Sequence, residues 1–585
     1  MTSVGPGRAD TRLRPPDPHW SPAAAPDAIR VTALEEALGL PEALCAVLVG
    51  RGLDEPAVAK QFLRPRLDDL HDPALLVDGV PAAARIADAI RAGETIFVHG
   101  DYDVDGICAT ALLTRWLRAL GGQVVPFVPH RQRDGYDFSP AGLNAAIEAG
   151  ASLIVTADCG TVAHDTIAAA RSAGIEVIVT DHHTVSGTLP DALAVVNPQR
   201  DDCPYPEKGL CGTGLAFKVC QLVGREIGAD NAPLEEHLDL VALATVADLV
   251  PLRGENRILV RYGLRRFADT RVPGIRALLA ITGVEPSEVT SGQLGFVIAP
   301  RINAVGRIGE AMDAVRLLLT DSADVARSLA MVLDETNKRR RDEDQRTLDE
   351  ALEIVLSDYD ADRDFGVVLA KEGWHPGVIG IVASRVVERI HRPVVMIALS
   401  DTGGRGSARS IPGFDLYAAL AQCSDHLVRF GGHRQAAGMD VRTEAVADFR
   451  DAFNTVARER LQPDDLRPVL RPDLALGLEE IDLKLVHWLE YLSPHGMGNP
   501  GPLFMACGVA LTAAKVVGAN HMKLTLRQDE GRLDAIGFGF ADRFSVEELT
   551  AGSYDVLFRV ERNEWRGRAR PQAKLVDLRP AGGHP

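Results

Sequence analysis

The stretch that decides the fold reads TIFVHGDYDVDG, residues 95–106. Its first four residues are apolar or β-branched, which is typical of a buried strand. The following segment, ICATALLTRWLRAL at residues 107–120, predicts a helix. One histidine and three aspartates therefore lie at the end of a strand, although like charges repel and buried carboxylates are costly to desolvate. Something at this strand end must offset both costs.

Strand-like and helix-like segments alternate from about residue 86 to residue 197. The strand-like runs that follow residue 120 are QVVPFVP, SLIVTADCG, IEVIVTDHH and LAVVNP, and the helix-like runs are SPAGLNAAIEAG and VAHDTIAAARSAG. We expect Ser139 to cap the first of these helices. This alternation predicts a parallel sheet covered by helices on both faces, with ligands bound beyond the carboxyl ends of the strands. The polar residues expected at that edge are Asp101, Asp103, Asp105, Asp158, Asp181, His182 and His183.

The residue types at this edge predict a site for divalent cations. Its nitrogen and oxygen donors are His99, Asp103, Asp105, Asp158, His182 and Asp248, the last in TVADLVPL. Two cations would neutralise the carboxylates; carboxylates suit Mg²⁺ or Mn²⁺, and imidazoles favour Mn²⁺. A shared carboxylate can hold two ions about 3.5–4 Å apart, which activates water and clamps a phosphoryl group.

Two other interpretations of the acidic loop are a solvated turn and a single Ca²⁺ site, because D-x-D-x-D-G matches the first half of an EF-hand loop. The twelfth position counted from Asp101 is Leu112, however, and not glutamate. The motif DHH can likewise consist of a capping Asp181 with surface histidines. If it belongs to a metal site, one histidine can bind an ion while the other donates to a phosphate oxygen, and Asp181 can orient an imidazole.

The composition limits the classes of protein that the chain can belong to. Its 585 residues predict three or four domains, and no apolar run reaches the length of a membrane span. The Pro-rich first 20 residues lack a secretory signal, so we expect them to be disordered and the protein to be cytoplasmic. Eight scattered cysteines without a C-x-x-C pair argue against a zinc ribbon or disulfide framework. The net charge of −18 argues against general nucleic-acid binding, but it allows a local basic channel.

Further boundaries follow from local composition. Residues 311–356 contain no Pro or Gly and predict a long, partly solvated helix between two lobes. A second α/β unit is expected from about residue 364, and LQPDDLRPVLRPD marks a boundary near residue 465. Alternating segments such as HMKLTLR, together with turns such as DEGR, predict a small β-barrel at the C-terminus.

The motifs HGDYDVDG, TADCG, TDHH and TVADLVPL, in this order, resemble those of the DHH phosphoesterase superfamily. The companion segments CGTGLAFK, PRINAVGRIG, EGWHPGVIGIVASR, FGGHRQAAG and HGMGNPGPLF resemble its bacterial exonucleases specific for single-stranded DNA. The resemblance implies an α/β protein with a DHH-type parallel-sheet catalytic domain and a second, DHH-associated α/β domain, joined by a long helix, plus an OB-type β-barrel. The expected boundaries are 1–75 for a partly disordered N-terminal segment, 76–310 for the catalytic domain, 311–357 for the helix, 358–464 for the second α/β domain and 465–585 for the barrel.

The resemblance also implies roles for single residues. One metal ion would be bound by His99, Asp103 and Asp158, and the other by Asp105, Asp158, His182 and Asp248, with Asp158 as the bridge. Asp101 and His183 would support these ligands or contact the scissile phosphate. The implied reaction is 5′→3′ release of mononucleotides with Mn²⁺ or Mg²⁺, in DNA repair and recombination. Cys159 stands where many members have Asn, and Val104 where Ala is common, but neither change removes a ligand.

Phosphate contacts are expected outside the metal site. Guanidinium groups fit phosphates bidentately, and glycines allow backbone N–H groups to approach them. The candidates are Arg301, Asn303, Arg307, Arg409, Gly431, Gly432 and His433. The alternatives are ion pairs on a helix surface for the first group and a tight turn for the glycines. In the barrel we expect DNA contacts from Trp565, Arg566 and Arg568.

Two other functions are compatible with the superfamily. Some members cleave short oligonucleotides, cyclic dinucleotides or pyrophosphate, but these are typically shorter and lack the barrel. A non-catalytic replication scaffold would be expected to lack ligands, whereas every ligand position is filled here. The partners implied by the resemblance are single-stranded DNA, a RecQ-like helicase and a single-strand-binding protein, and the expected state is a monomer. A narrow cleft between two lobes would admit only an unpaired strand.

Overall fold

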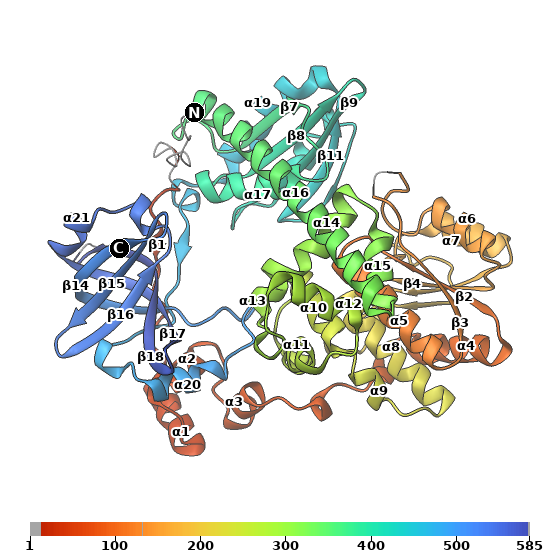
Figure 1. Cartoon of the computed structure of the whole chain (residues 1–585). Helices are drawn as coiled ribbons and strands as arrows, with labels where there is room; N and C mark the ends of the chain where they lie inside the picture. The colour runs from red at the N-terminus through yellow and green to blue at the C-terminus, as the bar shows by residue number, and fades with distance from the viewer. Residues whose placement is uncertain (1–12, 14, 132, 186, 583–585) are drawn as a thin grey trace. The chain divides into compact units, whose positions relative to one another are not determined.

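The computed structural model describes residue 13 and residues 15–131, 133–185 and 187–582 (Figure 1). Most of the first 20 residues, which were expected to be disordered, lie outside this part. The chain divides into two compact units. The parallel-sheet unit consists of residues 60–339 and 492–501, and the barrel unit of residues up to 59, 340–491 and 502–585. Within the described residues, no helix has both the length and the apolar character that crossing a bilayer requires.

The parallel-sheet unit contains the sheet that the sequence predicts. Its strands are β2 (Thr95–Gly100), β3 (Gln123–Phe127), β4 (Leu153–Ala157), β5 (Glu176–Thr180) and β6 (Ala194–Val196). They lie in the order β3-β2-β4-β5-β6, and every pair is parallel. The carboxyl ends of β2, β4 and β5 therefore meet at one edge, where the loops with the aspartates and histidines begin.

Helices cover both faces of this sheet, as its side-chain alternation requires. In β2, Ile96 and Val98 pack into one apolar core, whereas Phe97 packs into another. The first core includes side chains of α4 (Gly79–Ala92), α5 (Val104–Ala119) and α8 (Gly212–Ile227), and the second those of α6 (Pro140–Glu148) and α7 (His164–Ser172) (Figure 1). Ser139 precedes α6 as expected, but its side chain makes no capping hydrogen bond.

The rest of the unit is helical up to residue 339. Its main elements are α9 (Ala232–Glu235), α10 (Leu238–Ala247), α11 (Gly254–Arg266), α12 (Pro273–Thr282), α13 (Ser291–Gln293), the π-helical η5 (Leu294–Ile298), α14 (Ala299–Ile308) and α15 (Ala311–Leu319). The single helix expected over 311–357 is instead two helices, because α16 (Ala323–Asp358) begins after a break. Thr320 is extended and Ser322 caps the amide of Val325, so side-chain oxygens compete with the helical hydrogen bonds there.

A fully buried ion pair links two helices of this unit. Lys218 in α8 and Glu255 in α11 are 2.6 Å apart, Nζ to Oε1, and are 0% and 1% exposed. The Tyr205 hydroxyl donates to the other carboxylate oxygen at 2.6 Å, and the amide of His71 donates to Oε1 at 2.7 Å. Lys218 also donates to the carbonyl of His71 at 3.1 Å. The two buried charges are thus paired and surrounded by further hydrogen bonds.

Residues 492–501 belong to the parallel-sheet unit, although they lie far from the rest of it in the sequence. The Arg257 guanidinium, which is buried, donates to the carbonyls of Leu492 and Ser493 at 2.9 Å. The amide of Leu252 donates to the carbonyl of Met497 at 2.7 Å. We call residues 492–501 the strap.

The barrel unit contains a mixed sheet and a closed barrel. The sheet has the order β10-β11-β9-β8-β7, and only β7–β8 is parallel. Its strands are β7 (Val367–Glu372), β8 (Val394–Ser400), β9 (Gly403–Arg409), β10 (Arg429–Gly432) and β11 (Ala436–Val441), with helices α17 (Ile379–Ile390), α18 (Leu416–Gln422) and α19 (Val446–Arg460).

The C-terminal strands form the predicted barrel. They are β14 (Phe504–Val517), β15 (His521–Gln528), β16 (Gly531–Gly537), β17 (Ser553–Trp565) and β18 (Arg568–Pro580), with α21 (Val546–Thr550) before β17. The order β14-β15-β16-β18-β17 closes on itself because β14 also pairs with β17. The short strand β13 (Leu474–Ala475) extends the sheet beside β14. The side chain of Trp565 lies outside the described part of the chain.

The N-terminal segment contains more structure than the sequence suggested. Its described part includes β1 (His19–Trp20), α1 (Ala28–Leu38), α2 (Glu42–Gly50) and α3 (Pro56–Leu63). Strand β1 pairs with β12 (Val469–Leu470), and the Trp20 indole donates to Asp577 in β18 at 2.8 Å. The sequence analysis did not predict these three short helices, which are separated by Pro41 and Pro56 and bury residues such as Leu34 and Leu44.

Candidate metal centre

The acidic loop between β2 and α5 is held by its own backbone. Asp103 is the N-cap of α5, and its Oδ1 accepts hydrogen bonds from the amides of Asp105 and Gly106 at 2.9 and 3.1 Å. A side chain at Gly106 would place its Cβ 2.5 Å from the backbone of Asp101. The turn therefore requires glycine after the third aspartate, and it holds Asp101 at 4% exposure.

Asp105 is held by the N-terminus of α8. Its two carboxylate oxygens accept from the amides of Gly212 and Thr213 at 2.6 and 2.7 Å. Unsatisfied amides and the dipole at a helix N-terminus stabilise negative charge. A Cβ at Gly212 would lie 2.6 Å from the side chain of Asp158, so this glycine lets α8 reach the centre. The segment CGTGLAFK was noted only for its resemblance, so this function was not predicted.

Asp158 lies at the middle of the site, directly after β4. It is 2% exposed, and its φ of 66° is in the left-handed region that residues other than glycine rarely adopt. Its amide donates to the carbonyl of Thr180 at the end of β5, at 3.0 Å. The structure thus holds a strained aspartate between two strand ends, and such strain is concentrated at functional sites.

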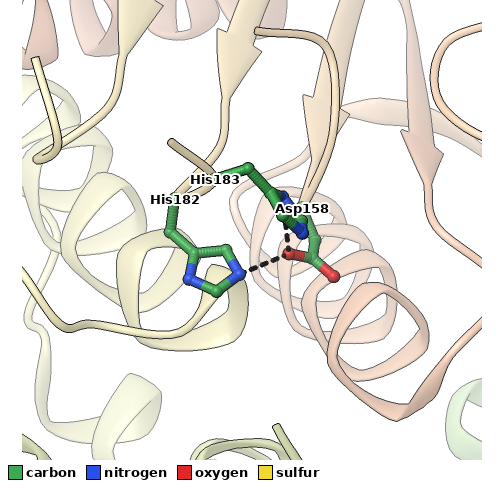
Figure 2. A group of neighbouring side chains, drawn as sticks. All are labelled: Asp158, His182 and His183. Carbon is green, nitrogen blue, oxygen red and sulfur yellow. Dashed lines mark ion pairs between the residues drawn. The ribbon is translucent and has the colours of Figure 1, made fainter. Parts of the chain in front are cut away.

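The two adjacent histidines contact different groups, as Figure 2 shows. The Nε2 atom of His182 is 3.0 Å from Asp158 Oδ1, 3.7 Å from Asp248 Oδ2 and 3.8 Å from Asp105 Oδ2. The Nδ1 atom of His183 is 2.7 Å from Asp181 Oδ1 and 4.0 Å from Asp158 Oδ1. His182 therefore faces the carboxylates of the centre, whereas His183 lies against Asp181.

Asp181 orients the His183 ring. Its Oδ1 also accepts from the amides of His182 and His183 at 2.8 and 3.1 Å, and its Oδ2 accepts from the amide of Thr161 at 2.9 Å. The other ring nitrogen of His183 lies 3.3 Å from the Tyr136 hydroxyl. These contacts fix the orientation of the His183 imidazole beside the carboxylate cluster.

Three groups of side chains bring ligand atoms within 4.8 Å of one another. They are Asp101 with Asp103 and Asp158, Asp105 with His182 and Asp248, and Asp158 with His182 and His183. Asp248 and six of the seven residues predicted from the strand ends are therefore gathered at one place. The seventh, Asp181, lies beside them.

His99 is the predicted ligand that none of these groups contains. Its ring is fully buried between Phe127 and Phe138, at centroid distances of 5.3 and 5.1 Å. Cys159 Sγ lies 3.7 Å from its Nδ1, and a Cβ at Gly142 in α6 would lie 2.3 Å from its Nε2. The group with Asp103 and Asp158 contains Asp101, and His99 stays a predicted ligand, with its Nε2 buried and without a hydrogen-bond partner in the described chain.

The buried carboxylates of the cluster repel one another, so positive charge among them would be stabilising. Burial, together with the neighbouring carboxylates, raises the pKa of Asp158 and Asp101 well above the usual range and that of Asp248 to about 9. Asp101 Oδ1, Asp158 Oδ1, His99 Nε2 and His182 Nε2 are buried and make no hydrogen bond in the described chain, although His182 Nε2 lies 3.0 Å from Asp158 Oδ1. Unpaired acceptor atoms beside mutually repelling carboxylates fit a site for divalent cations.

In chelator, without bound metal ions, the protein is expected to lose stability as pH rises. The raised carboxyl pKa values mean that the folded state binds more protons than the unfolded state above about pH 4, so the free energy of unfolding falls with pH there. Burial lowers the pKa of His183, but Asp181 outweighs this effect and raises it to about 9, so this contribution is lost as pH approaches 9.

Thermal unfolding between pH 5 and 9, in chelator and in Mn²⁺, tests this expectation. In chelator Tm should fall over this range, and Mn²⁺ should remove most of the fall, because cations replace the protons. A metal-free Tm that rises toward pH 9 contradicts the assignment of these carboxylates to one repulsive cluster.

The residues predicted to contact phosphate on α14 have partners inside the unit. Arg301 donates to Asp334 at 2.9 Å and to the carbonyl of Val297 at 2.6 Å. Asn303 accepts a hydrogen bond from the amide of Val104 at 3.2 Å, so it supports the start of α5. The side chain of Arg307 is half-buried and interacts with another group of the protein. The ion pair of Arg301 agrees with the alternative interpretation given above, and Asn303 supports the acidic loop.

The remaining predicted contacts lie in the barrel unit. Gly431, Gly432 and His433 are exposed at the end of β10. Gly432 has a φ of 139°, and a Cβ there would lie 2.5 Å from the carbonyl of Ala436, so a tight turn requires this glycine. Arg409 donates to the Ser407 hydroxyl at 3.2 Å and to the carbonyl of Ala408 at 2.8 Å.

Comparison with protein families identifies three domains. Residues 95–245 match the N-terminal domain of the DHH family, residues 364–459 match the DHHA1 domain, and residues 472–577 match the RecJ OB domain. The first match contains all the residues of the acidic cluster except Asp248.

Curated relatives and solved structures match almost the whole chain. The single-stranded-DNA-specific exonuclease RecJ of Bacillus subtilis is 38% identical over 94% of this chain and 70% of its own length. The RecJ of Escherichia coli is 35% identical over 92% of this chain and 96% of its own length. The crystal structure of RecJ from Thermus thermophilus in complex with Mn²⁺ superimposes with a TM-score of 0.82 at 32% identity, over 97% of this chain and 80% of that one. The same protein in complex with Mg²⁺ gives a TM-score of 0.78.

Proposed function

The chain belongs to the RecJ family of single-stranded-DNA-specific exonucleases, and we propose from this premise that it hydrolyses single-stranded DNA from its ends with two divalent cations. The observation that carries the proposal is the buried cluster in which Asp158 lies between two groups of ligands. Related RecJ structures are complexes with Mn²⁺ and with Mg²⁺, and the carboxylate-rich donors here suit both ions.

We assign the ligands from the measured groups. Asp101, Asp103 and Asp158 would hold one cation, and Asp105, His182, Asp248 and Asp158 would hold the other. His99, whose Nε2 is buried without a hydrogen-bond partner in the described chain, stays a proposed ligand of the first cation, as the resemblance implies. The cations would supply the positive charge that activates water and stabilises the phosphoryl oxygens.

The other residues of the centre orient these ligands and the substrate. The α8 amides hold Asp105, and Asn303 fixes the start of α5, so the aspartates are kept in place before DNA binds. His183 is held by Asp181, which raises its pKa in the metal-free cluster, and in its protonated form it can donate to a non-bridging phosphate oxygen. Its placement next to His182 supports this role.

The finer properties of the reaction are part of the proposal. Degradation is expected to run 5′→3′ and to release mononucleotides, in the cytoplasm and in DNA repair and recombination. The residues proposed to contribute phosphate contacts are Arg301, Asn303, Arg307, Arg409, Gly431, Gly432 and His433, with Arg301 exchanging its ion pair with Asp334 for a phosphate. Partnership with a RecQ-like helicase and a single-strand-binding protein, and a monomeric state, stay predictions.

Digestion of end-labelled DNA tests the function. With Mn²⁺, a 5′-labelled single strand should release labelled mononucleotide at once, whereas a 3′-labelled strand should shorten progressively. Blunt duplex of the same sequence should be attacked at least about 100-fold more slowly. Equal attack on duplex, or release of the 3′ label first, would overturn the assignment, and cleavage of dinucleotides alone would favour a small-molecule phosphodiesterase.

A further inference from the structure

The segment HGMGNPG, residues 495–501, forms most of the strap, and neither the metal ligands nor the phosphate contacts account for it. The strap belongs to the parallel-sheet unit, although the residues before and after it in the sequence belong to the barrel unit. It is bonded to the loop between α10 and α11, residues 248–253, which begins with the proposed metal ligand Asp248. An otherwise unexplained motif therefore lies against a loop that starts at the metal centre.

The carboxylate of Asp248 is not held in place by a hydrogen bond. Asp103 and Asp105 accept hydrogen bonds from backbone amides, whereas no group of the described chain donates one to the Asp248 side chain. The Nε2 atom of His182 lies 3.7 Å from its Oδ2, which is too far for a hydrogen bond. The position of this carboxylate therefore depends on the backbone that carries it.

The backbone directly after Asp248 is strained. Leu249 has a φ of 60°, in the left-handed region that residues other than glycine rarely adopt. Its side chain is 65% exposed, so packing of this side chain does not hold the residue in that conformation. Helices commonly end before a left-handed residue, but glycine is usual there. The loop must therefore be held by contacts of its later residues.

The strap supplies these contacts. The amide of Leu252 donates to the carbonyl of Met497 at 2.7 Å, and the Nε atom of Arg253 donates to the carbonyl of Gly498 at 2.7 Å. Leu252 is 1% exposed, so the strap carbonyl provides a buried residue with the partner that its amide requires. Two consecutive residues of the loop are thus bonded to two consecutive residues of the strap.

Two glycines allow the strap to come this close. A Cβ at Gly496 would lie 2.7 Å from the side chain of Leu252, and a Cβ at Gly498 would lie 3.0 Å from the side chain of Pro251. Gly498 also has a φ of 70°, which favours glycine. A side chain at either position would push the loop away from the strap.

The strap holds its own shape through Asn499. The side-chain amide of this residue is buried and donates to the carbonyls of Leu492 and Pro494, at 2.8 Å each. Its backbone exchanges two hydrogen bonds with Gly496, at 3.0 and 3.1 Å, which closes a four-residue turn. The carbonyls that accept from the loop are therefore fixed by the strap itself.

We propose that the strap positions Asp248 for metal binding, with Gly498 and Arg253 as the positioning residues. By holding the end of the loop, the strap keeps Leu249 in its strained conformation and the Asp248 carboxylate beside His182. The inference rests on the proposed function for the role of Asp248 as a metal ligand. A change in the strap should therefore weaken the cation site that contains Asp248 and leave the other site intact.

Titration of the metal-free full chain with Mn²⁺ tests the proposal, because the electron paramagnetic resonance signal of the free ion reports how many ions are bound. Wild type should bind two ions. G498A places a methyl group against Pro251 and should weaken one of the two sites by about tenfold or more. The matched control G283A introduces alanine at a φ of 67° after α12, where its Cβ would have no neighbour within 4 Å, and should bind as wild type.

A second variant keeps the test decisive if G498A does not fold. R253M removes the hydrogen bond to the strap from an exposed position, so it should fold and weaken the same site by about threefold or more. R253K keeps a donor and should recover part of the affinity. R265M removes another exposed arginine, in α11, and should leave both sites unchanged.

The double variant G498A/D248N separates positioning from a general structural role. D248N should lose the same site, and adding G498A should cause no further loss, whereas independent effects would add. Wild-type binding by both G498A and R253M, or an equal loss at both sites, would overturn the inference while the metal centre stands. If D248N itself binds two ions as tightly as wild type, the assignment of Asp248 in the proposed function is wrong, and the inference fails with it.

Discussion

Asp158→Asn is expected to lower the rate of single-stranded DNA hydrolysis by roughly 10³-fold or more, about 4 kcal/mol in activation free energy. Asp158 is the one carboxylate that lies in two of the ligand groups, 3.0 Å from His182 and within reach of Asp101 and Asp103. Its removal would weaken both cation sites at once, whereas a substitution elsewhere in the cluster would weaken one. Steady-state digestion of labelled DNA at saturating Mn²⁺ measures the effect.

Stability shows whether this loss comes from the metal centre. Asparagine removes one of several repelling buried charges, so the variant should be at least as stable as wild type in chelator. Mn²⁺ should raise the Tm of wild type but not that of the variant, because binding to the folded state alone stabilises it. Asp165→Asn, at an exposed position in α7, is the matched control and should behave as wild type. A near-normal rate for Asp158→Asn would show that the bridging carboxylate is misassigned.

Glu255→Gln is expected to destabilise the parallel-sheet unit by about 3–5 kcal/mol. The substitution conserves volume but leaves the ammonium of Lys218, which is fully buried, without a counter-charge. Two acceptors then remain close to the Lys218 ammonium: the carbonyl of His71, at 3.1 Å, and the side-chain amide oxygen that replaces the carboxylate. Urea unfolding followed by circular dichroism measures the loss.

The double variant Lys218→Met/Glu255→Gln separates loss of the pair from loss of packing. Because it removes both charges, it should recover a large part of the lost stability. Glu226→Gln, at the exposed end of α8, should change stability by less than about 0.5 kcal/mol. A double variant as unstable as Glu255→Gln would mean that hydrogen bonds of the network, and not the unpaired charge, dominate.

Local sequence pattern was sufficient to place the metal centre in the fold. Apolar runs such as TIFV and SLIVTA predicted the strands, and the rule that strand ends meet at one edge of a parallel sheet brought Asp101, Asp158 and His182 together. The barrel was predicted in the same way, from alternation and turn residues.

The features that pattern could not predict depend on packing between distant segments. The orientation of the His99 ring depends on its packing against Phe127, Phe138 and Gly142, which the local sequence around His99 does not contain. The contact of α8 with Asp105 requires the close approach allowed by Gly212, which the sequence does not distinguish from other glycines. The break before α16 depends on single side-chain hydrogen bonds at a position where the composition favours helix throughout.

The strap has a practical consequence for dissecting this enzyme. A shortened protein that ends near residue 465, where composition suggested a boundary, would lack the carbonyls of Leu492 and Ser493 and leave the Arg257 guanidinium buried with fewer acceptors. Loss of activity in such a truncation would reflect damage to the nuclease core and say nothing about the barrel. Truncation studies should therefore graft residues 492–501 onto the core, or leave the chain whole and alter the barrel by point substitution.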